Sequence, residues 1–286
     1  FTFWILSSLP SLSKLISADR PAVMGILNVT PDSFSDGGRF LLRDEALRHA
    51  DKMIQEGVDI IDIGGESTRP GANRVSAQEE LDRVIPVLEA IRNGTDIALS
   101  IDTSTPRVMT EAASVGIEMI NDVRALRRDG ALTAARDTGL PICLMHMQGD
   151  PQTMQLNPNY IDLMSDIGQF FEERITACIA AGVDRELLIL DPGFGFGKTP
   201  QQNLQLINEL DRFAYLGRPL LVGLSRKSTI SKVLASEGED RLIGSLTGAV
   251  WAYLRGAAII RVHDVEQTRM ALTMAKALAT NGKDLI

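Results

Sequence analysis

The stretch LLILDPGFGFGK, from Leu187 to Lys198, is the one that decides the predicted fold. Its apolar start is typical of a strand that is buried on both faces, as strands of parallel sheets are. The strand ends at Asp191, and a proline and three alternating glycines then predict a turn. A carboxylate at such a strand end is costly to bury unless a ligand or a neighbour donates hydrogen bonds to it. Asp191 is therefore either a ligand-binding residue or a cap of the following helix.

The glycines of this turn do not form a nucleotide-binding motif. Gly193, Gly195 and Gly197 lack the G-x-G-x-x-G spacing, and Pro192 occupies the position of the first glycine of a P-loop. We therefore exclude both kinds of nucleotide-binding loop here.

Short apolar runs alternate with helical patterns along the rest of the chain. After the second run, Ser76 and Glu79 have the spacing of a capping box, and apolar residues recur at helical spacing from Leu81 to Ile91. The predicted strands are Ala22–Leu27, Val58–Ile63, Ile97–Ile101, Ile117–Ile120, Leu140–Met145, Leu187–Leu190, Pro219–Leu224 and Ala257–Val262. Eight β/α units in about 250 residues predict an α/β fold of the (β/α)8 TIM-barrel type, with a doubly wound open sheet as the alternative.

No linker, low-complexity tract or block of charge divides the chain into domains. Its 286 residues, 44% of them hydrophobic, fit one large α/β domain. We expect a single barrel domain over residues 21–286, preceded by an extension, residues 1–20, of unknown role. The extension lacks the basic stretch of a secretory signal, so we expect either a mis-assigned start or a strand that covers the bottom of the fold.

Charge and cysteine content argue against several classes of protein. The net charge of −8 argues against nucleic-acid binding, and no apolar run approaches the about 18 residues that span a membrane. Cys143 and Cys178 do not form a C-x-x-C pair, so we expect two buried thiols in a reducing compartment. These features predict a cytoplasmic protein with neither nucleic-acid nor membrane partners.

Nearly every junction between a predicted strand and the next helix is polar. In a barrel these junctions meet at one end, which is where function resides. The polar groups are Asn28–Gly38, Asp62, Gly64–Gly71, Asp102–Ser104, Asn121–Asp122, His146, Asp191, Ser225–Ser228, Arg261 and His263–Asp264. One polar strand end is ordinary helix capping, whereas polar ends on all the strands predict a site.

Some of these residues also have a purely structural interpretation. His146 could be a core histidine with satisfied hydrogen bonds, and Lys198 could lie on a solvated face. Lys227 and Arg261 are better candidates because each adjoins a buried strand, and barrels commonly hold phosphate near strands seven and eight. With three histidines in the chain, a multi-histidine metal centre is not expected, which leaves oxygen ligands for any hard cation.

Two carboxylates and an amide would form the floor of the mouth. Asp102, Asn121 and Asp191 suit the amino-oxo edge of a flat heterocycle, because they offer paired acceptors and an amide. Three groups above this floor suit a phosphate or diphosphate with its magnesium: Asn28, Arg261 and His263. The residues alone thus predict a heterocycle joined to a phosphorylated group.

Several motifs resemble those of bacterial dihydropteroate synthases. They are Met24–Gly38 (MGILNVTPDSFSDGG), Gly64–Gly71 (GGESTRPG), Asp191–Lys198 (DPGFGFGK), Ser225–Ser228 (SRKS) and Arg261–Asp264 (RVHD). The likeness runs from about residue 21 to the C-terminus, and residues 1–20 match nothing in the family. The resemblance implies condensation of (7,8-dihydropterin-6-yl)methyl diphosphate with 4-aminobenzoate, giving 7,8-dihydropteroate and diphosphate in folate biosynthesis. It also implies Mg2+ as cofactor, sulfonamides as inhibitors and a homodimer.

The resemblance further assigns roles to single residues. The pterin would contact Asp102, Asn121, Asp191 and Lys227. The 4-aminobenzoate would contact Thr68, Pro70, Phe196 and Ser228. The diphosphate would contact Asn28, Thr68, Arg261 and His263, with Asn28 also a ligand of Mg2+. The catalytic residues would be Asp36, Arg69 and Lys227, the first two on loops that close over the reactants.

A dissociative mechanism follows from these charges as our hypothesis. An aromatic amine is a weak nucleophile, so help must come from stabilising the departing diphosphate and the cation left behind, the latter at Asp36. Two alternatives remain open. A methyltetrahydrofolate-dependent methyltransferase would not need Arg261 and His263, and a non-catalytic pterin-binding paralogue would be expected to lose Asp36 or Arg69, which are both present.

Overall fold

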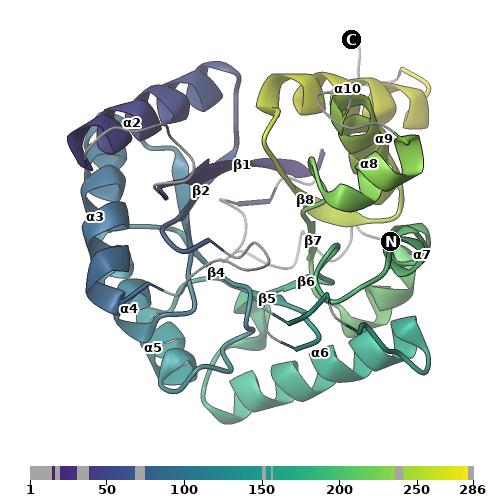
Figure 1. The fold of residues 1–286 in the computed structure, drawn as a ribbon, viewed down its shortest axis with the longest axis horizontal. Helices are drawn as coiled ribbons and strands as arrows, with labels where there is room; N and C mark the ends of the chain where they lie inside the picture. The colour runs from purple at the N-terminus through teal and green to yellow at the C-terminus, as the bar shows by residue number, and fades with distance from the viewer. Residues whose placement is uncertain are drawn as a thin grey trace.

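Parallel strands close into a barrel, and helices surround it (Figure 1). The computed structural model describes residues 15–16, 20–30, 39–67, 75–149, 153–155, 157–235 and 241–282. The strands are β1 (Ala22–Asn28), β2 (Ile60–Gly64), β3 (Ala98–Asp102), β4 (Met119–Asp122), β5 (Ile142–Met145), β6 (Leu188–Asp191), β7 (Leu220–Val222) and β8 (Ala257–Val262). They follow one another in chain order, and β1 pairs with β8, with Ala22 beside Ile259. The predicted (β/α)8 barrel is thus confirmed, and the open sheet is excluded.

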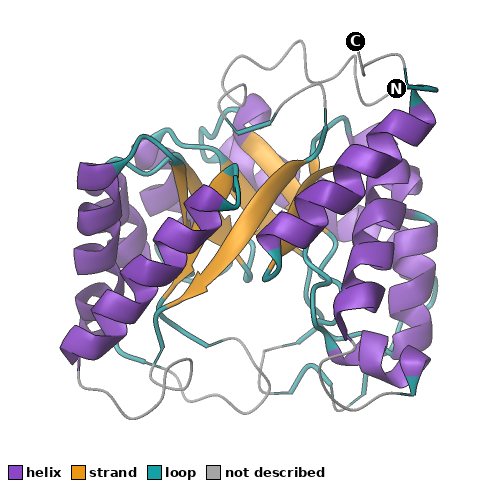
Figure 2. Cartoon of the chain, turned by 90° about the horizontal axis from the view of Figure 1, so that it is seen from above, coloured by secondary structure: helices purple, strands orange, loops and turns teal. Residues whose placement is uncertain are grey.

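Helices form the outer layer, and Figure 2 shows them flanking the strands to the left and right. They are α2 (Arg39–Gln55), α3 (Ala77–Gly94), α4 (Pro106–Val115), α5 (Ala131–Thr138), α6 (Leu163–Ala180), α7 (Pro200–Asn208), α8 (Ser228–Leu234), α9 (Arg241–Leu254) and α10 (Val265–Ala279), with the 3-10 helices η3 (Arg185–Leu187) and η4 (Leu210–Leu216). Ser76 caps α3 as predicted, accepting a hydrogen bond from the backbone N–H of Glu79. None of the helices in the described ranges is long and apolar enough to cross a membrane.

The polar strand ends belong to the strands themselves. The predicted ranges of three strands end one residue before the observed strands do, because they include only the apolar run and leave out the polar residue that ends it. In the structure β1, β3 and β6 each end on that polar residue: Asn28, Asp102 and Asp191. These side chains are therefore held on the barrel rather than on flexible connections.

The alternation of side chains along each strand produces two layers inside the barrel. On β6, Leu188 and Leu190 pack outward against the helices, while Ile189 packs in an inner apolar cluster at the barrel centre. Because side chains alternate with a period of two, Asp191 must also point inward, one layer above Ile189. The same alternation holds on β2, where Ile60 lies in the inner cluster and Asp62 follows two residues later. A polar layer thus lies above an apolar one.

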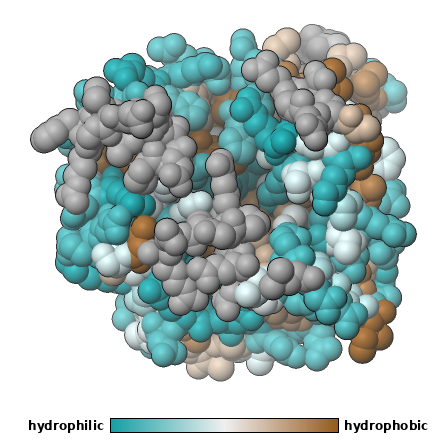
Figure 3. Space-filling model, viewed as in Figure 1, coloured by the Kyte–Doolittle hydropathy of each residue, from teal (hydrophilic) through white to brown (hydrophobic). Residues whose placement is uncertain are grey.

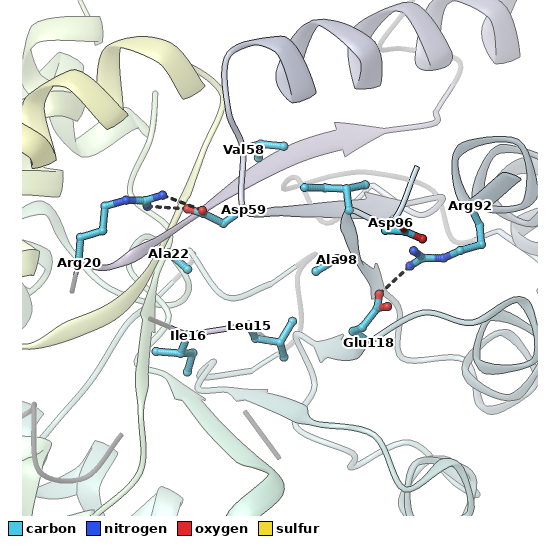
Figure 4. A pocket seen from close by; sticks show the side chains of 11 residues that line it. Leu15, Ile16, Arg20, Ala22, Val58, Asp59, Arg92, Asp96, Ala98 and Glu118 are labelled. Atoms are coloured by element: carbon cyan, nitrogen blue, oxygen red, sulfur yellow. Dashed lines mark hydrogen bonds and ion pairs between the residues drawn. The ribbon is translucent and has the colours of Figure 1, made fainter. Parts of the chain in front are cut away.

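The opposite end of the barrel is covered by residues from the N-terminal segment. Leu15 and Ile16 are buried and pack against the inner apolar cluster. Arg20 forms a bidentate salt bridge with Asp59, in which Nη1 lies 2.6 Å from Oδ2 and Nη2 lies 2.7 Å from Oδ1. Figure 4 shows this pair beside a cavity of about 610 Å³. The described part of the segment thus covers the bottom of the barrel, although not as a strand.

Both cysteines are free and buried, as predicted. Cys143 lies on β5 in the inner cluster, and Cys178 lies on α6 in the outer one. Burial raises the pKa of both thiols, so each behaves as a small apolar side chain.

Candidate active site

Arg261 lies at the centre of the inward polar layer, between two carboxylates. Its Nε donates to Asp62 Oδ2 at 2.6 Å, and its Nη2 donates to Asp102 Oδ2 at 2.9 Å. Burial opposes the charge of the guanidinium, yet the two carboxylates outweigh that effect and raise the pKa of Arg261. Burial also raises the pKa of Asp102 to about 7, although Arg261 opposes the shift. Arg261 therefore keeps its positive charge between two carboxylate acceptors.

Asn121 has its amide oriented by the same cluster. Its Nδ2 donates to Asp62 Oδ2 at 3.0 Å, and both residues are buried. The other oxygen of Asp62, Oδ1, is buried and has no hydrogen-bond partner among the described residues. A buried acceptor without a donor is costly, so this part of the mouth is suited to a ligand that carries N–H groups.

Asp191 occupies the predicted position at the end of β6 and is buried. Its Oδ1 accepts the backbone N–H of Gly193 at 2.7 Å. Burial raises the pKa of its carboxyl, and the nearby ammonium of Lys227 opposes this. The helix that follows is capped by Thr199, which forms a complete capping box with Gln202. The helix-cap interpretation of Asp191 was therefore wrong, and the ligand-binding one remains.

Lys227 joins the two predicted substrate subsites. It precedes α8, and its Nζ donates to the carbonyl oxygen of Phe194. The same Nζ lies 4.5 Å from the centre of the Phe196 ring, within cation–π range. Burial lowers the pKa of Lys227 to about 8, with Asp191 opposing. One cation thus lies near both a predicted pterin residue and a predicted aminobenzoate residue.

Two more of the predicted diphosphate residues are Asn28, at the end of β1, and His263, directly after β8. His263 is oriented by Ser225, whose Oγ is 3.0 Å from Nδ1 of the imidazole. Asn28, at the end of β1, pairs with Gly64 of β2. A Cβ placed on Gly64 would lie 3.7 Å from Asn28 Oδ1 and 3.5 Å from Asp102 Cβ. The glycine therefore leaves room for a ligand between the amide of Asn28 and the carboxylate of Asp102.

Of the remaining predicted site residues, the structure describes only Ser228. Ser228 is the first residue of α8 and is exposed, next to Lys227. Four others lie outside the described residues, so their roles stay predictions: Asp36, Thr68, Arg69 and Pro70.

Sequence reasoning missed two parts of the site. Asp62 was noted on its strand but not included among the site residues, although its position two residues after Ile60 indicates an inward direction. An apolar group also packs beside Phe196 at the mouth, made of Val123, Met145, Met147 and Met154. Its members come from separate loops and strand ends, so no local pattern could identify them.

His146, directly after β5, and Lys198, at the end of the glycine-rich turn, are both buried. The backbone N–H of His146 donates to the carbonyl oxygen of Asp191 at 2.8 Å. Lys198 is 2% exposed, so the solvated-face interpretation of this lysine was wrong. Its Nζ lies 3.0 Å from His146 Nδ1. The structural interpretation of His146, as a buried histidine with satisfied hydrogen bonds, therefore holds.

Comparison with known proteins agrees with this geometry. A family model described as pterin binding enzyme matches residues 24–263. The dihydropteroate synthase of Haemophilus influenzae is 51% identical over 267 residues, which is 93% of this chain and 97% of that protein. A crystal structure of the Yersinia pestis dihydropteroate synthase with a sulfonamide drug complex is 54% identical, with a TM-score of 0.87 over 91% of this chain and 95% of that one.

A further solved structure is that of the Xanthomonas albilineans dihydropteroate synthase with 4-aminobenzoic acid. It is 49% identical, with a TM-score of 0.87 over 91% of this chain and 94% of that one. The family match covers β1 from Met24 onward, all of β2 to β8 and each described site residue. The chain therefore belongs to the pterin binding enzymes and, among them, to the dihydropteroate synthases.

Proposed function

We propose that the inward polar layer holds the pterin diphosphate, and that the space beside Phe196 holds 4-aminobenzoate. As a dihydropteroate synthase, the chain is a transferase that joins these two substrates to give 7,8-dihydropteroate and diphosphate. The observation that carries the assignment of residues is the buried group of acceptors around Arg261. Within it, one oxygen of Asp62 has no donor among the described residues. A flat heterocycle rich in N–H groups supplies what this group lacks.

The pterin ring would be held by Asp102, Asn121, Asp191 and Lys227. Asp191 has one oxygen bonded to Gly193, so its other oxygen is the one that would face the ring. Lys227 would donate to an acceptor on the ring edge, and the oriented amide of Asn121 would accept and donate beside it. Burial makes such hydrogen bonds strong and makes their loss costly.

The diphosphate would lie near Arg261, His263 and Asn28. The described residues contain no group of three or more His, Cys, Asp or Glu side chains that could hold a metal ion. This donor set still fits Mg2+, which commonly binds to substrate phosphates and waters with few protein ligands. Asn28 Oδ1 is the protein oxygen that would hold it, and Thr68 would contact the diphosphate, as the family resemblance implies. When bound, Mg2+ would neutralise charge on the diphosphate.

The chemistry then follows from the leaving group. The C–O bond between the pterin methylene and the diphosphate breaks, and the diphosphate takes the electron pair. Arg261 and His263 would stabilise that anion. The amine nitrogen of 4-aminobenzoate supplies the electron pair of the new C–N bond and loses a proton. Asp36 would stabilise the pterin cation, and Arg69 would help to close the mouth.

The aminobenzoate subsite would be shaped by Phe196, Ser228, Thr68 and Pro70. The structure with 4-aminobenzoic acid bound to the Xanthomonas albilineans enzyme supports such a subsite in the family. In this chain Phe196 packs beside the apolar group of the mouth, with Lys227 over its ring. An aromatic ring on one side and an ammonium group nearby suit an aromatic carboxylate.

The alternatives have less support. A methyltetrahydrofolate-dependent methyltransferase would not need Arg261 and His263, yet both are built into the mouth by specific hydrogen bonds. A non-catalytic paralogue would be expected to lack Asp36 or Arg69, and the sequence has both.

A homodimer is supported by an apolar surface over α7, α8 and α9. Large apolar side chains are exposed there: Leu204, Val233, Leu234, Ile243 and Trp251. They line a groove of about 370 Å³, and Figure 3 shows hydrophobic residues along the right-hand edge, where Figure 1 places α7 to α10. Surfaces of this kind mark protein contacts, and a second copy of the chain is the occupant we propose.

Sedimentation equilibrium tests the homodimer. Ile243, 70% exposed, would lie in the interface, and Ile243→Glu should give a monomer. Ile161, 100% exposed before α6, provides the control, and Ile161→Glu should stay dimeric. A monomeric wild-type protein, or a dimeric Ile243→Glu variant, would contradict the proposed surface.

A product assay tests the proposed roles as a whole. The protein is incubated with the pterin diphosphate and 4-aminobenzoate, with Mg2+ or with a chelator. We expect dihydropteroate and diphosphate in equal amounts only when Mg2+ is present. Equal turnover in the chelator would contradict the metal assignment. In a separate incubation, methyl transfer from added methyltetrahydrofolate to an added thiol would favour the rival enzyme.

A further inference from the structure

Lys198 is a buried cation next to the proposed site, and its ammonium group is bonded to the backbone of the turn that follows Asp191. It is 2% exposed. Its Nζ donates to the carbonyl oxygens of Gly193 at 3.0 Å and Phe196 at 3.1 Å, and lies 3.0 Å from His146 Nδ1. An ammonium group has three N–H donors, and each is directed at one of these atoms. The lysine therefore holds the turn that follows Asp191 from behind.

This turn depends on side chains for its shape. Gly193, Gly195 and Gly197 all have positive φ, at 70°, 84° and 61°, so its backbone is intrinsically free to adopt many conformations. All five carbonyl oxygens from Gly193 to Gly197 accept hydrogen bonds from side chains. Lys198 serves two of them, and the remaining donors are Gln155, Tyr160 and Lys227. Lys198 thus contributes more to this turn than any other donor.

The turn carries Phe196 into the mouth. The carbonyl of Phe196 is bonded to Lys198 on one side, and its ring lies 4.5 Å from the ammonium of Lys227 on the other. A shift of this carbonyl would move the ring relative to Lys227. The direction of the ring therefore depends on the bond from Lys198.

The charge of Lys198 is held at an energetic cost. Burial lowers the pKa of Lys198 to about 7, while the carboxylate of Asp191 opposes the shift and Lys227 adds to it. Burial likewise lowers the pKa of His146, which keeps its imidazole neutral and able to accept at Nδ1. An apolar side chain in such a place is often as stable as a buried charge, so stability alone does not account for a lysine here.

We propose that Lys198 is a positioning residue for the aminobenzoate subsite, because its ammonium group fixes the Gly193–Gly197 turn and thereby the ring of Phe196. It acts through the turn and touches neither substrate. The inference rests on the proposed function, in which Phe196 lines that subsite. It predicts a specific effect on 4-aminobenzoate and little effect on the pterin diphosphate.

Two variants separate hydrogen bonding from charge. Lys198→Met keeps the length of the side chain and removes its donors, and Lys198→Gln keeps two N–H donors without the charge. Lys232→Met, on the exposed face of α8, is the matched control. The readouts are KM for 4-aminobenzoate and Kd for the pterin diphosphate from calorimetry, with thermal unfolding followed by circular dichroism.

Lys198→Met should raise KM for 4-aminobenzoate at least about tenfold, because it loses two hydrogen bonds to a charged donor. Its Kd for the pterin diphosphate should stay within about threefold of the wild-type value, and Lys198→Gln should recover most of the loss in KM. An unchanged KM in Lys198→Met would overturn the inference. An equal loss of pterin affinity in both variants would also overturn it, because that result would indicate an effect of charge on Asp191. A failure of Lys198→Met to fold would overturn it as well.

Wild-type protein and Phe196→Ala distinguish this inference from the proposed function. If the wild type forms no dihydropteroate, or if Phe196→Ala leaves KM for 4-aminobenzoate unchanged, the proposed function or its subsite is wrong. If both behave as expected and Lys198→Met matches Lys232→Met, only the role of Lys198 is wrong.

Discussion

Arg261 and Asp62 are 199 residues apart in the chain, yet Nε of Arg261 donates to Oδ2 of Asp62 at 2.6 Å. They lie on β8 and β2, and β1 pairs with both of these strands. The closure of the barrel therefore brings together the cation and the carboxylate that organise the mouth. Asp62 also accepts from Asn121, so one residue orients both the predicted diphosphate side and the predicted pterin side.

Asp62→Asn should weaken the pairing with Arg261 and the binding of the pterin diphosphate. An amide oxygen in the place of Oδ2 could still accept from both Arg261 and Asn121, but the negative charge beside Arg261 is lost. The amide nitrogen would then take the place of Oδ1 and oppose the N–H groups of the ligand. Breaking a buried ion pair costs about 3–5 kcal/mol. Asp102 still pairs with Arg261 in the variant, so we expect the free energy of unfolding to fall by about 3 kcal/mol. KM for the pterin diphosphate should rise with it. Urea denaturation and steady-state kinetics measure both, with exposed Asp129→Asn as control. Wild-type stability and KM in Asp62→Asn would contradict this role.

Asp36→Ala tests the dissociative mechanism. If Asp36 stabilises a cation that is present only near the transition state, kcat should fall while ground-state binding changes little. Electrostatic stabilisation in a closed site contributes about 2.7–4 kcal/mol, so kcat should fall about a hundredfold or more. Stopped-flow binding of the pterin diphosphate with Mg2+, alongside turnover, is the measurement. A loss of affinity with kcat intact would show that Asp36 only binds substrate.

Sulfonamides should compete with 4-aminobenzoate in this enzyme. The solved Yersinia pestis enzyme carries a sulfonamide drug complex, and this chain keeps the Thr68–Gly71 stretch without an insertion. Raising the concentration of 4-aminobenzoate should relieve inhibition in steady-state kinetics, because the two compounds would occupy one subsite. Inhibition that is independent of 4-aminobenzoate concentration would place the drug elsewhere.

Lys198 should make stability depend on pH. Burial lowers its pKa from 10.5 to about 7, so between these values the unfolded chain holds a proton that the folded chain has lost. Unfolding then takes up a proton, and the contribution of this residue to the free energy of unfolding rises with pH. The wild type should therefore gain stability relative to Lys198→Met as pH rises from about 7 to about 9.

Urea denaturation of both proteins across this range measures that difference. The titratable groups that face Lys198 are present in both proteins: His146, Tyr160, Asp191 and Lys227. A difference in stability that is constant, or that shrinks, as pH rises would show that Lys198 keeps an ordinary pKa in the folded protein.

The sequence predicted the barrel because each strand is a separate apolar run followed by a polar residue. The inward direction of Asp191 and Asp102 also follows from local alternation, once the strand boundaries are known. By the same rule Asp62 could have been assigned to the site, since Ile60 and Asp62 alternate with the outward residues Ile61 and Ile63.

Local sequence patterns could not predict which side chains bind the carbonyl oxygens of the Gly193–Gly197 turn. Gln155 and Tyr160 donate to carbonyls about 40 residues later, and their approach depends on how the loop after β5 packs. The burial of Lys198 was missed for the same reason, because a lysine after a glycine-rich turn is normally solvated. The cover of the barrel bottom by Leu15 and Ile16 was one of two alternatives for residues 1–20, and no local pattern chose between them.

Asp191→Asn tests the assignment of the pterin site most directly. One oxygen of Asp191 is bonded to the N–H of Gly193, so the amide nitrogen of the variant would face the ligand and oppose its N–H groups. Two charge-assisted hydrogen bonds of about 1.5–3 kcal/mol each would be lost, which predicts at least about a hundredfold weaker binding of the pterin diphosphate. Calorimetry of the wild type, Asp191→Asn and Asp129→Asn makes the comparison. We expect Asp129→Asn to bind as the wild type does and Asp191→Asn to stay folded without detectable binding, whereas wild-type affinity in Asp191→Asn would contradict the site.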